Sequence, residues 1–173
     1  MYTIHKIESK MELPYNVIDI DTGNEHFILQ FDSFDDNQSD YSIKMGGVTG
    51  KFSIQYHSND INCQFECDIT IGNVYAFYIA LDTAYDILFG RNATAVLENY
   101  GKSLKHKHTS LIFNFDKRGH CNVKGFFKNA SNHYRNGINF SFELDQIYIT
   151  DILTSMEIFF QELKRIQGHS NFY

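Results

Sequence analysis

The sequence predicts an α+β fold, in which a mostly antiparallel β-sheet is covered by two long amphipathic helices. Two observations lead to this prediction. Apolar and polar residues alternate through much of residues 1–71 and again within residues 93–144, which is typical of strands with one face in water. Two other segments repeat apolar residues at helical spacing. Neighbouring strands joined by short turns favour antiparallel pairing, because parallel strands need a long crossover between them.

The chain is expected to form a single domain over residues 1–173. Its length suits one domain, and 16 Phe and 11 Tyr supply large apolar side chains for a sizeable core. One Pro and 11 Gly leave no room for a long flexible linker.

Residues 1–71 form the strand-rich part of the prediction. Every second residue from Ile61 to Ile69 is apolar, which indicates a strand with one wet face. Turn-forming residues 21–24 separate two earlier strands. Residues 32–40 then follow as an expected loop, which carries four acidic side chains.

The first helix is predicted at about residues 73–89. Apolar residues recur at helical spacing from Val74 to Leu88, so one stripe should lie on the sheet. Asn73 is a suitable N-cap, and Gly90 is a suitable stop.

Further strands are predicted at about residues 93–144. The expected strands are 93–97, 109–115, 120–127 and 138–144, and the expected loops between them include 98–108 and 129–137.

The C-terminal helix is predicted at about residues 150–167. Its apolar stripe runs from Ile149 to Ile166, and Gly168 is expected to end it. Lys164 and Arg165 lie in its last turn, where cations complement the partial negative charge of a helix C-terminus.

Charge and hydropathy limit the partners. The net charge is −6, which disfavours nonspecific binding to nucleic acid or to an anionic membrane, since both need a positive field. No stretch approaches the roughly 18 uninterrupted apolar residues of a membrane span. Residues 1–6 lack the apolar core of a signal peptide, so a cytoplasmic location is expected.

The three cysteines cannot all pair with one another. Cys63 and Cys67 would face the same side of one strand, but roughly 13 Å apart at ~3.3 Å per residue, which is too far for a disulfide. Reduced thiols are the simplest expectation, and they agree with a cytoplasmic location. Cys121 follows His120 directly, so in a strand the two side chains point to opposite faces and cannot form a Cys/His catalytic pair. Cys121 is expected to be a core or half-buried thiol.

The remaining chemical motifs are weak. Gly101-Lys102-Ser103 resembles the end of a phosphate-binding loop, but the Gly required five residues earlier is Val96. In Lys105–His108 the two histidines would share a face and could bind a metal ion. The two lysines beside them would repel a cation, however, and no third ligand is near in sequence. We therefore expect no catalytic residue, no cofactor and no metal.

Four carboxylates are candidates for acid–base chemistry: Asp35, Asp36, Glu66 and Asp68. Sequence alone places no apolar pocket around them. A solvated acidic surface is the expected alternative for these four side chains. The segment Asp32–Asp40 could bind a basic surface, where opposed charges speed association.

The second half of the chain carries an ordered set of features that resembles a known family. The helix that ends at Gly90 precedes a hairpin containing Gly119-His120, and a later strand ends in Asp145-Gln146 before the final helix. Over about residues 74–165 this order resembles the small bacterial immunity proteins of polymorphic toxin systems typified by the WapI family. Where that family usually shows a Thr-Tyr-Leu-like continuation after Asp-Gln, this chain has Ile147-Tyr148-Ile149.

The resemblance implies a cytoplasmic, non-enzymatic protein that binds a cognate toxin domain, often a nuclease, and occludes its active site. The hairpin turn at 116–119 and the pair Asp145-Gln146 are expected to be structural, with Asp145 capping the final helix. The predicted interface is the acidic loop with its aromatic anchors: Asp32, Phe34, Asp35, Asp36, Asp40 and Tyr41. Two alternatives stay open. One is a small-ligand-binding protein or enzyme whose site is assembled from scattered residues, and the other is a structural or regulatory interaction module.

Overall fold

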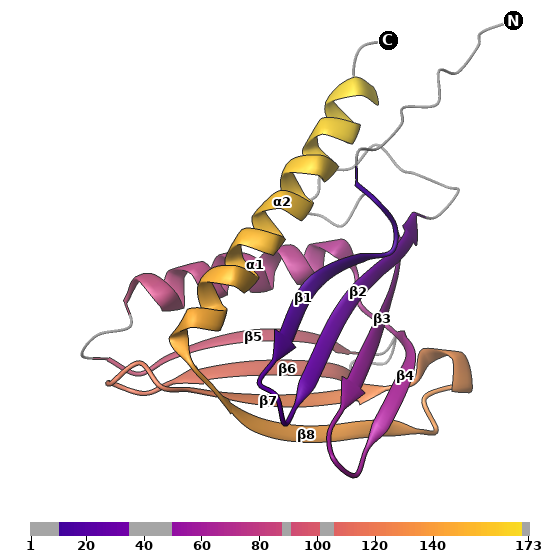
Figure 1. Ribbon diagram of the computed structural model, residues 1–173. Coiled ribbons are helices and arrows are strands. Elements are labelled where there is room, and N and C mark those ends of the chain that lie inside the picture. The colour runs from indigo at the N-terminus through magenta and orange to yellow at the C-terminus, as the bar shows by residue number, and fades with distance from the viewer. Residues whose placement is uncertain (1–10, 35–49, 88–90, 101–105, 171–173) are drawn as a thin grey trace, which may run out of the picture.

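A computed structural model describes residues 11–34, 50–87, 91–100 and 106–170, and these form an α+β fold with two antiparallel sheets of four strands each (Figure 1). Sheet A consists of β1 (Tyr15–Asp21), β2 (His26–Phe34), β3 (Gly50–His57) and β4 (Asn62–Cys67), side by side in that order. Sheet B consists of β5 (Ala93–Tyr100), β6 (Lys107–Phe115), β7 (Cys121–Lys128) and β8 (Gly137–Leu144), which also lie side by side in that order. The helices are α1 (Ile71–Asp86), the short 3-10 helix η2 (Ala130–Asn132) and α2 (Gln146–Ser170). The predicted fold class is confirmed, with the strands divided between two sheets.

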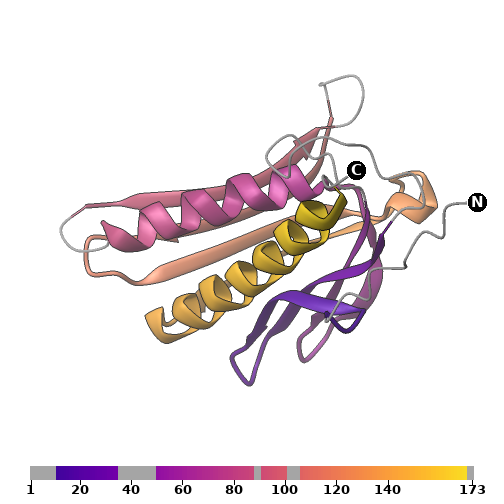
Figure 2. The same ribbon diagram turned by 90° about the horizontal axis from the view of Figure 1, so that it is seen from above.

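The two long helices form a layer between the sheets. Seen from above, α1 lies along sheet B, α2 runs beside α1, and sheet A lies on the far side of α2 (Figure 2). Phe77 of α1 packs on Phe113 of β6 with ring centroids 5.4 Å apart. Phe159 of α2 packs on Phe31 of β2 at 5.2 Å, while the next residue, Phe160, packs on α1. Consecutive aromatic residues of α2 therefore bind it to sheet A and to α1 at once.

At one end of the helix layer the two sheets touch directly. The ring of Phe27 in β2 lies 5.2 Å from Phe140 and 5.7 Å from Phe127, which belong to sheet B. Tyr56 of β3 stacks on Phe140 at 4.5 Å. Gly125 makes room for this ring, because a Cβ atom there would lie 2.0 Å from the ring of Phe140. Buried residues from both sheets and both helices thus form one core.

Helix α1 begins at a capping box three residues before the predicted N-cap. The side-chain oxygen of Thr70 accepts a hydrogen bond from the Asn73 N–H at 3.1 Å, and the Asn73 side chain accepts one from the Thr70 N–H at 2.9 Å. The predicted N-cap, Asn73, is therefore the third helical residue. The predicted apolar stripe is confirmed by burial of Val74, Phe77 and Leu81. Gly90, the predicted stop, lies outside the described residues.

Helix α2 begins four residues before its predicted start because Asp145 caps it. The Ile147 N–H donates to Asp145 Oδ1 at 3.4 Å, which satisfies one free donor of the first turn, as predicted for Asp145. The predicted end at Gly168 is wrong, since the helix continues to Ser170. One glycine costs a helix only about 1 kcal/mol, so it does not by itself end one.

Several strands are longer than predicted. Strand β2 includes residues 32–34, β5 extends to Tyr100, and β6 begins at Lys107, where loops were expected. In β5 and β6 the polar side chains pair across the strands, as with Lys107 and Glu98 at 2.8 Å. None of the helices in the described parts of the chain is long and apolar enough to cross a membrane.

Candidate functional site

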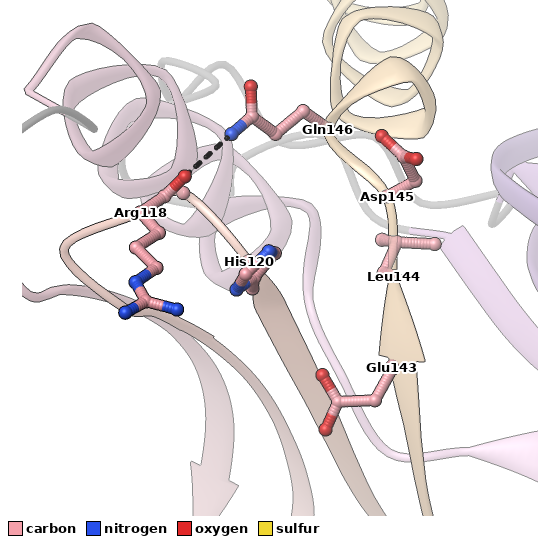
Figure 3. Close-up of a pocket in the computed structure, with 7 residues that line it drawn as sticks. Arg118, His120, Glu143, Leu144, Asp145 and Gln146 are labelled. Carbon is pink, nitrogen blue, oxygen red and sulfur yellow. Dashed lines mark hydrogen bonds between the residues drawn. The ribbon is translucent and has the colours of Figure 1, made fainter.

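The two motifs behind the family resemblance meet at one end of sheet B and line an open hollow of about 560 Å³ (Figure 3). We call it the hairpin hollow. The β6–β7 turn forms one wall, and the junction of β8 with α2 forms the other. Its lining residues are Arg118, Gly119, His120, Glu143, Leu144, Asp145 and Gln146.

Asp116 organises the β6–β7 turn. Its Oδ1 accepts hydrogen bonds from the N–H groups of Arg118 at 2.8 Å and His120 at 2.9 Å, and its Oδ2 lies 3.1 Å from His120 Nδ1. Desolvation raises the pKa of Asp116, but these hydrogen bonds outweigh it and lower the pKa below its ordinary value. The carboxylate therefore acts as a turn-forming group, as predicted for 116–119.

Gly119 and Gln146 fit together as a pair. Gly119 has φ +84°, a conformation that other residues rarely adopt, and a Cβ there would lie 1.9 Å from Gln146 Nε2. The same nitrogen donates a hydrogen bond to the Arg118 carbonyl oxygen at 3.4 Å. The side chain of Gln146 thus reaches across to the turn and occupies the space that the missing Cβ leaves free (Figure 3).

The hairpin hollow is polar and open to water. The side chain of His120 is 70% exposed, and Arg118, Glu143 and Asp145 are also exposed. A second hollow of about 470 Å³ adjoins it and shares His120 and Glu143. Such a surface can hold charged or hydrogen-bonding groups of a partner, but it does not exclude the water that weakens electrostatic catalysis.

The cysteines do not supply a nucleophile to this hollow. Cys121 is fully buried on the inner face of β7, and burial raises the pKa of its thiol to about 12. Cys67 is also buried, and burial raises the pKa of its thiol further still. A nucleophilic thiolate needs a lowered pKa, so these groups are packing residues. The predictions that all three cysteines are unpaired and that Cys121 is a core thiol are confirmed.

A second polar cluster joins the two sheets. The Tyr134 hydroxyl donates to Asp68 Oδ2 at 3.0 Å, and His108 Nδ1 lies 3.5 Å from the same oxygen. The rings of Tyr134 and His108 stack with centroids 3.8 Å apart. Tyr134 and the preceding His133 have φ values of 60° and 48°, which are strained for residues other than glycine. We call Asp68, His108 and Tyr134 the latch, because they connect the end of β4 with β6 and with the β7–β8 loop.

The predicted interface is only partly within the described residues. Asp32 and Phe34 lie in β2 and not in a loop, which corrects the prediction. The edge-to-face contact of Phe34 with Phe31 at 4.9 Å places it against the core, so it is not a free anchor. Asp32 accepts a hydrogen bond from Ser53 on the neighbouring strand at 2.9 Å. The other predicted interface residues, Asp35, Asp36, Asp40 and Tyr41, lie outside the described residues.

The weaker motifs can be placed in part. Of Lys105–His108, His106 is exposed and His108 belongs to the latch, while Lys105 and the segment 101–103 lie outside the described residues. Among the described residues, no three His, Cys, Asp or Glu side chains are grouped so that they could hold a metal ion. The latch was missed because its members are far apart in sequence, and no local pattern connects them.

Comparison of the chain with protein-family models, with curated proteins and with solved structures finds no match. The fold and the hairpin hollow therefore define an α+β protein with an open polar surface, and its function has to be argued from that geometry.

Proposed function

We propose that this protein is a cytoplasmic, non-enzymatic immunity protein that neutralises a cognate toxin domain by occluding its active site. The observation that carries the proposal is the contact between the two motifs of the resemblance. Gln146 of the Asp-Gln motif fills the space beside Gly119 of the Gly-His motif and bonds to the turn. Two motifs 26 residues apart thus form one structural unit.

This contact gives the resemblance a physical basis. A side chain at position 119 would require Gln146 to move, and a different residue at 146 would leave the Arg118 carbonyl without this donor. The two motifs are therefore expected to occur together in any chain that uses this hairpin-to-helix junction, whatever its other residues.

The surface chemistry favours binding over turnover. The hairpin hollow is open and lined mostly by exposed side chains, and its histidine is paired with the Asp116 carboxylate of its own turn. The thiols of Cys67 and Cys121 are buried and protonated at neutral pH. Occlusion of an enzyme requires only a complementary surface, and affinity then comes from a few well-packed residues.

Co-expression tests the proposal. The toxin domain encoded beside the gene is expressed in cells with and without this protein, and survival is measured together with the affinity of the two purified proteins. We expect protection and a one-to-one complex with a Kd in the nanomolar range, which corresponds to about −12 kcal/mol. Absence of both protection and binding would refute the immunity proposal.

The latch supports a second candidate, a small-ligand or enzyme site assembled from scattered residues. It brings a carboxylate, an imidazole and a phenol from three segments into contact, and the phenol belongs to Tyr134, which like the preceding His133 has a positive φ. Strain of this kind is found at functional sites. A screen of metabolites and hydrolase substrates with the wild type and Tyr134→Phe distinguishes the two. Ligand binding or turnover that the substitution abolishes would favour this candidate.

A further inference from the structure

The outer face of sheet B is uncovered within the described part of the chain, since both helices lie on its inner side (Figure 1). Val96 and Ile112 are cross-strand partners on this face, and Phe126 lies diagonally from Ile112. All three side chains are partly exposed, and an open hollow of about 420 Å³ lies beside Ile112 and Phe126. Exposed apolar side chains that are neighbours, rather than scattered, are typical of a contact surface.

Charges of opposite sign lie at the two ends of this face. Lys128 is at one end, with its Nζ 6.0 Å from the centroid of the Phe126 ring. Glu143 is at the other end, where it accepts a hydrogen bond from Asn122 at 3.0 Å. Asn122 and Lys128 are six residues apart on β7, which is about 20 Å at ~3.3 Å per residue. Glu143 and Lys128 therefore cannot neutralise each other within one chain.

A third charge lies at the centre of the face. Lys124 is exposed beside Ile112 and forms no ion pair within the described part of the chain. The remaining charges of the face, Glu98 and Lys107, already pair with each other at 2.8 Å. The face thus presents one central cation, one basic end and one acidic end to whatever covers it.

One rotation brings these charges together between two copies of the chain. A two-fold axis that lies between two stacked faces and crosses β7 at Gly125 exchanges positions 124 and 126, and positions 122 and 128. Lys124 of each copy then lies on the exposed ring of Phe126 in the other, a cation–π contact that occurs twice. Glu143, bonded to Asn122, comes beside Lys128 of the other copy, also twice.

The other two-fold arrangement does not pair these charges. An axis along the strands leaves each end of one face over the same end of the other. The Glu143 side chains of the two copies would then share one end and the Lys128 side chains the opposite end. The charge pattern therefore favours antiparallel stacking, and both partners' charges are known because the partner is the same chain.

The size of the face indicates how tightly two copies bind. Four strands of eight or nine residues, at ~3.3 Å per residue and ~4.8 Å between strands, give a face of roughly 500 Å² in projection. Two such faces are smaller than the ~1,600 Å² of a standard stable interface and suit a weak one.

We propose that the outer face of sheet B binds a second copy of this chain, as an antiparallel two-fold dimer in which Lys124 covers Phe126 and Lys128 pairs with Glu143. The dimer goes beyond the immunity function and does not depend on it. Its Kd is expected at about 10–100 µM, so it forms in concentrated solution.

Sedimentation equilibrium of the full chain, from about 5 µM to 1 mM, tests the dimer together with its charge pairing. Lys128→Glu alone and Glu143→Lys alone each place like charges together, and each should weaken self-association at least tenfold. An equimolar mixture of these two variants should dimerise within about threefold of the wild type, because every Lys128 and Glu143 contact then joins opposite charges. Lys164→Glu on the exposed side of α2 is the control for net charge and should change the Kd by less than about threefold.

The outcomes decide both the dimer and its surface. A wild type that keeps the mass of one chain up to 1 mM overturns the proposal and leaves the face to a different partner. A dimer that both single variants form as well as the wild type, or that the mixture fails to restore, shows that another surface is used. Circular dichroism checks that each variant is folded, and the mixture needs no further substitution.

Discussion

Sheets A and B are built in the same way on the inside and differently on the outside. Each is a four-stranded antiparallel meander whose inner face is a row of large apolar residues. The outer face of sheet A holds carboxylates and amides beside Ile28 and Lys51. The outer face of sheet B holds amides and Glu143 towards one end and, around Lys124, the partly exposed Val96, Ile112 and Phe126. The comparison shows that the inner faces determine the fold, while the outer faces carry different chemistry without disturbing it.

The largest expected effect comes from breaking the joint between the sheets. Phe27→Ala removes a fully buried ring that touches both Phe127 and Phe140, and we expect the free energy of unfolding to fall by about 3–5 kcal/mol. Ile28→Ala, on the outer side of the same strand, is the control and should cost less than about 1 kcal/mol. Urea unfolding followed by circular dichroism measures both. Similar losses for the two variants would show that the inner and outer faces are not as distinct as proposed.

A second prediction concerns sheet B and its junction with α2. Gly119→Ala should destabilise by about 1–2 kcal/mol from the left-handed backbone alone, and more if Gln146 must move. With Gln146→Ala in the background, the space opens and the added penalty of Gly119→Ala should shrink to the backbone part. The double-mutant cycle, measured by urea unfolding, isolates the contact. A coupling energy near zero would contradict the view that the two motifs form one unit.

The latch provides a smaller test of how the sheets are held together. Tyr134→Phe removes the hydroxyl that donates to Asp68 but keeps the ring stacked on His108. Because the Asp68 side chain is 39% exposed and water can replace the lost donor, we expect a loss of about 1 kcal/mol. Tyr148→Phe, whose hydroxyl is not in the latch, serves as the control in thermal unfolding. A loss confined to the control would show that the latch does not stabilise the joint.

The smallest effect is a gain on sheet A. Desolvation raises the pKa of the Asp32 carboxyl, so ionising it costs more free energy in the folded protein than in the unfolded chain. This destabilisation is absent at pH values below the ordinary carboxyl pKa of 3.8 and appears as the pH rises. Asp32→Asn should therefore stabilise at pH 7, by no more than roughly 0.5 kcal/mol because water screens this partly exposed group. The gain should vanish at acid pH, whereas Asp82→Asn should show none at either pH. Tm values of the wild type and both variants, measured from acid pH to pH 7, give the change in stability.

Much of the fold follows from sequence pattern. Alternation located the strands, and helical spacing located both amphipathic helices, because these periods reflect burial of one face. Division into two sheets could not be predicted, since it depends on contacts such as Phe27 with Phe140 between residues 113 positions apart. The helix starts were misplaced because the capping residues, Thr70 and Asp145, precede the apolar stripes.

The candidate site was harder to predict than the fold. The Gly119 and Gln146 motifs were identified as structural, but their contact is visible only once α2 begins at Gln146. The polar neighbours of Asp32 predict a loop, but strand β2 continues past a register shift between Phe31 and Ser33, and Asp32 bonds to Ser53 on the next strand. Glu66 is one of the four candidate carboxylates in the sequence, but its cross-strand position next to Ser53 depends on strand order.

The alternation of sheet A has a consequence for how such a protein can change over generations. Outward side chains such as Gln55 and Gln64 lie outside the core, so substitutions there can accumulate without loss of folding. Inward neighbours such as Ile54 cannot vary in this way. A scan of all substitutions along β3 should therefore show tolerance that alternates along the strand, except at the buried Ser53, and a lineage could change one side of the sheet over generations while inheriting the other intact.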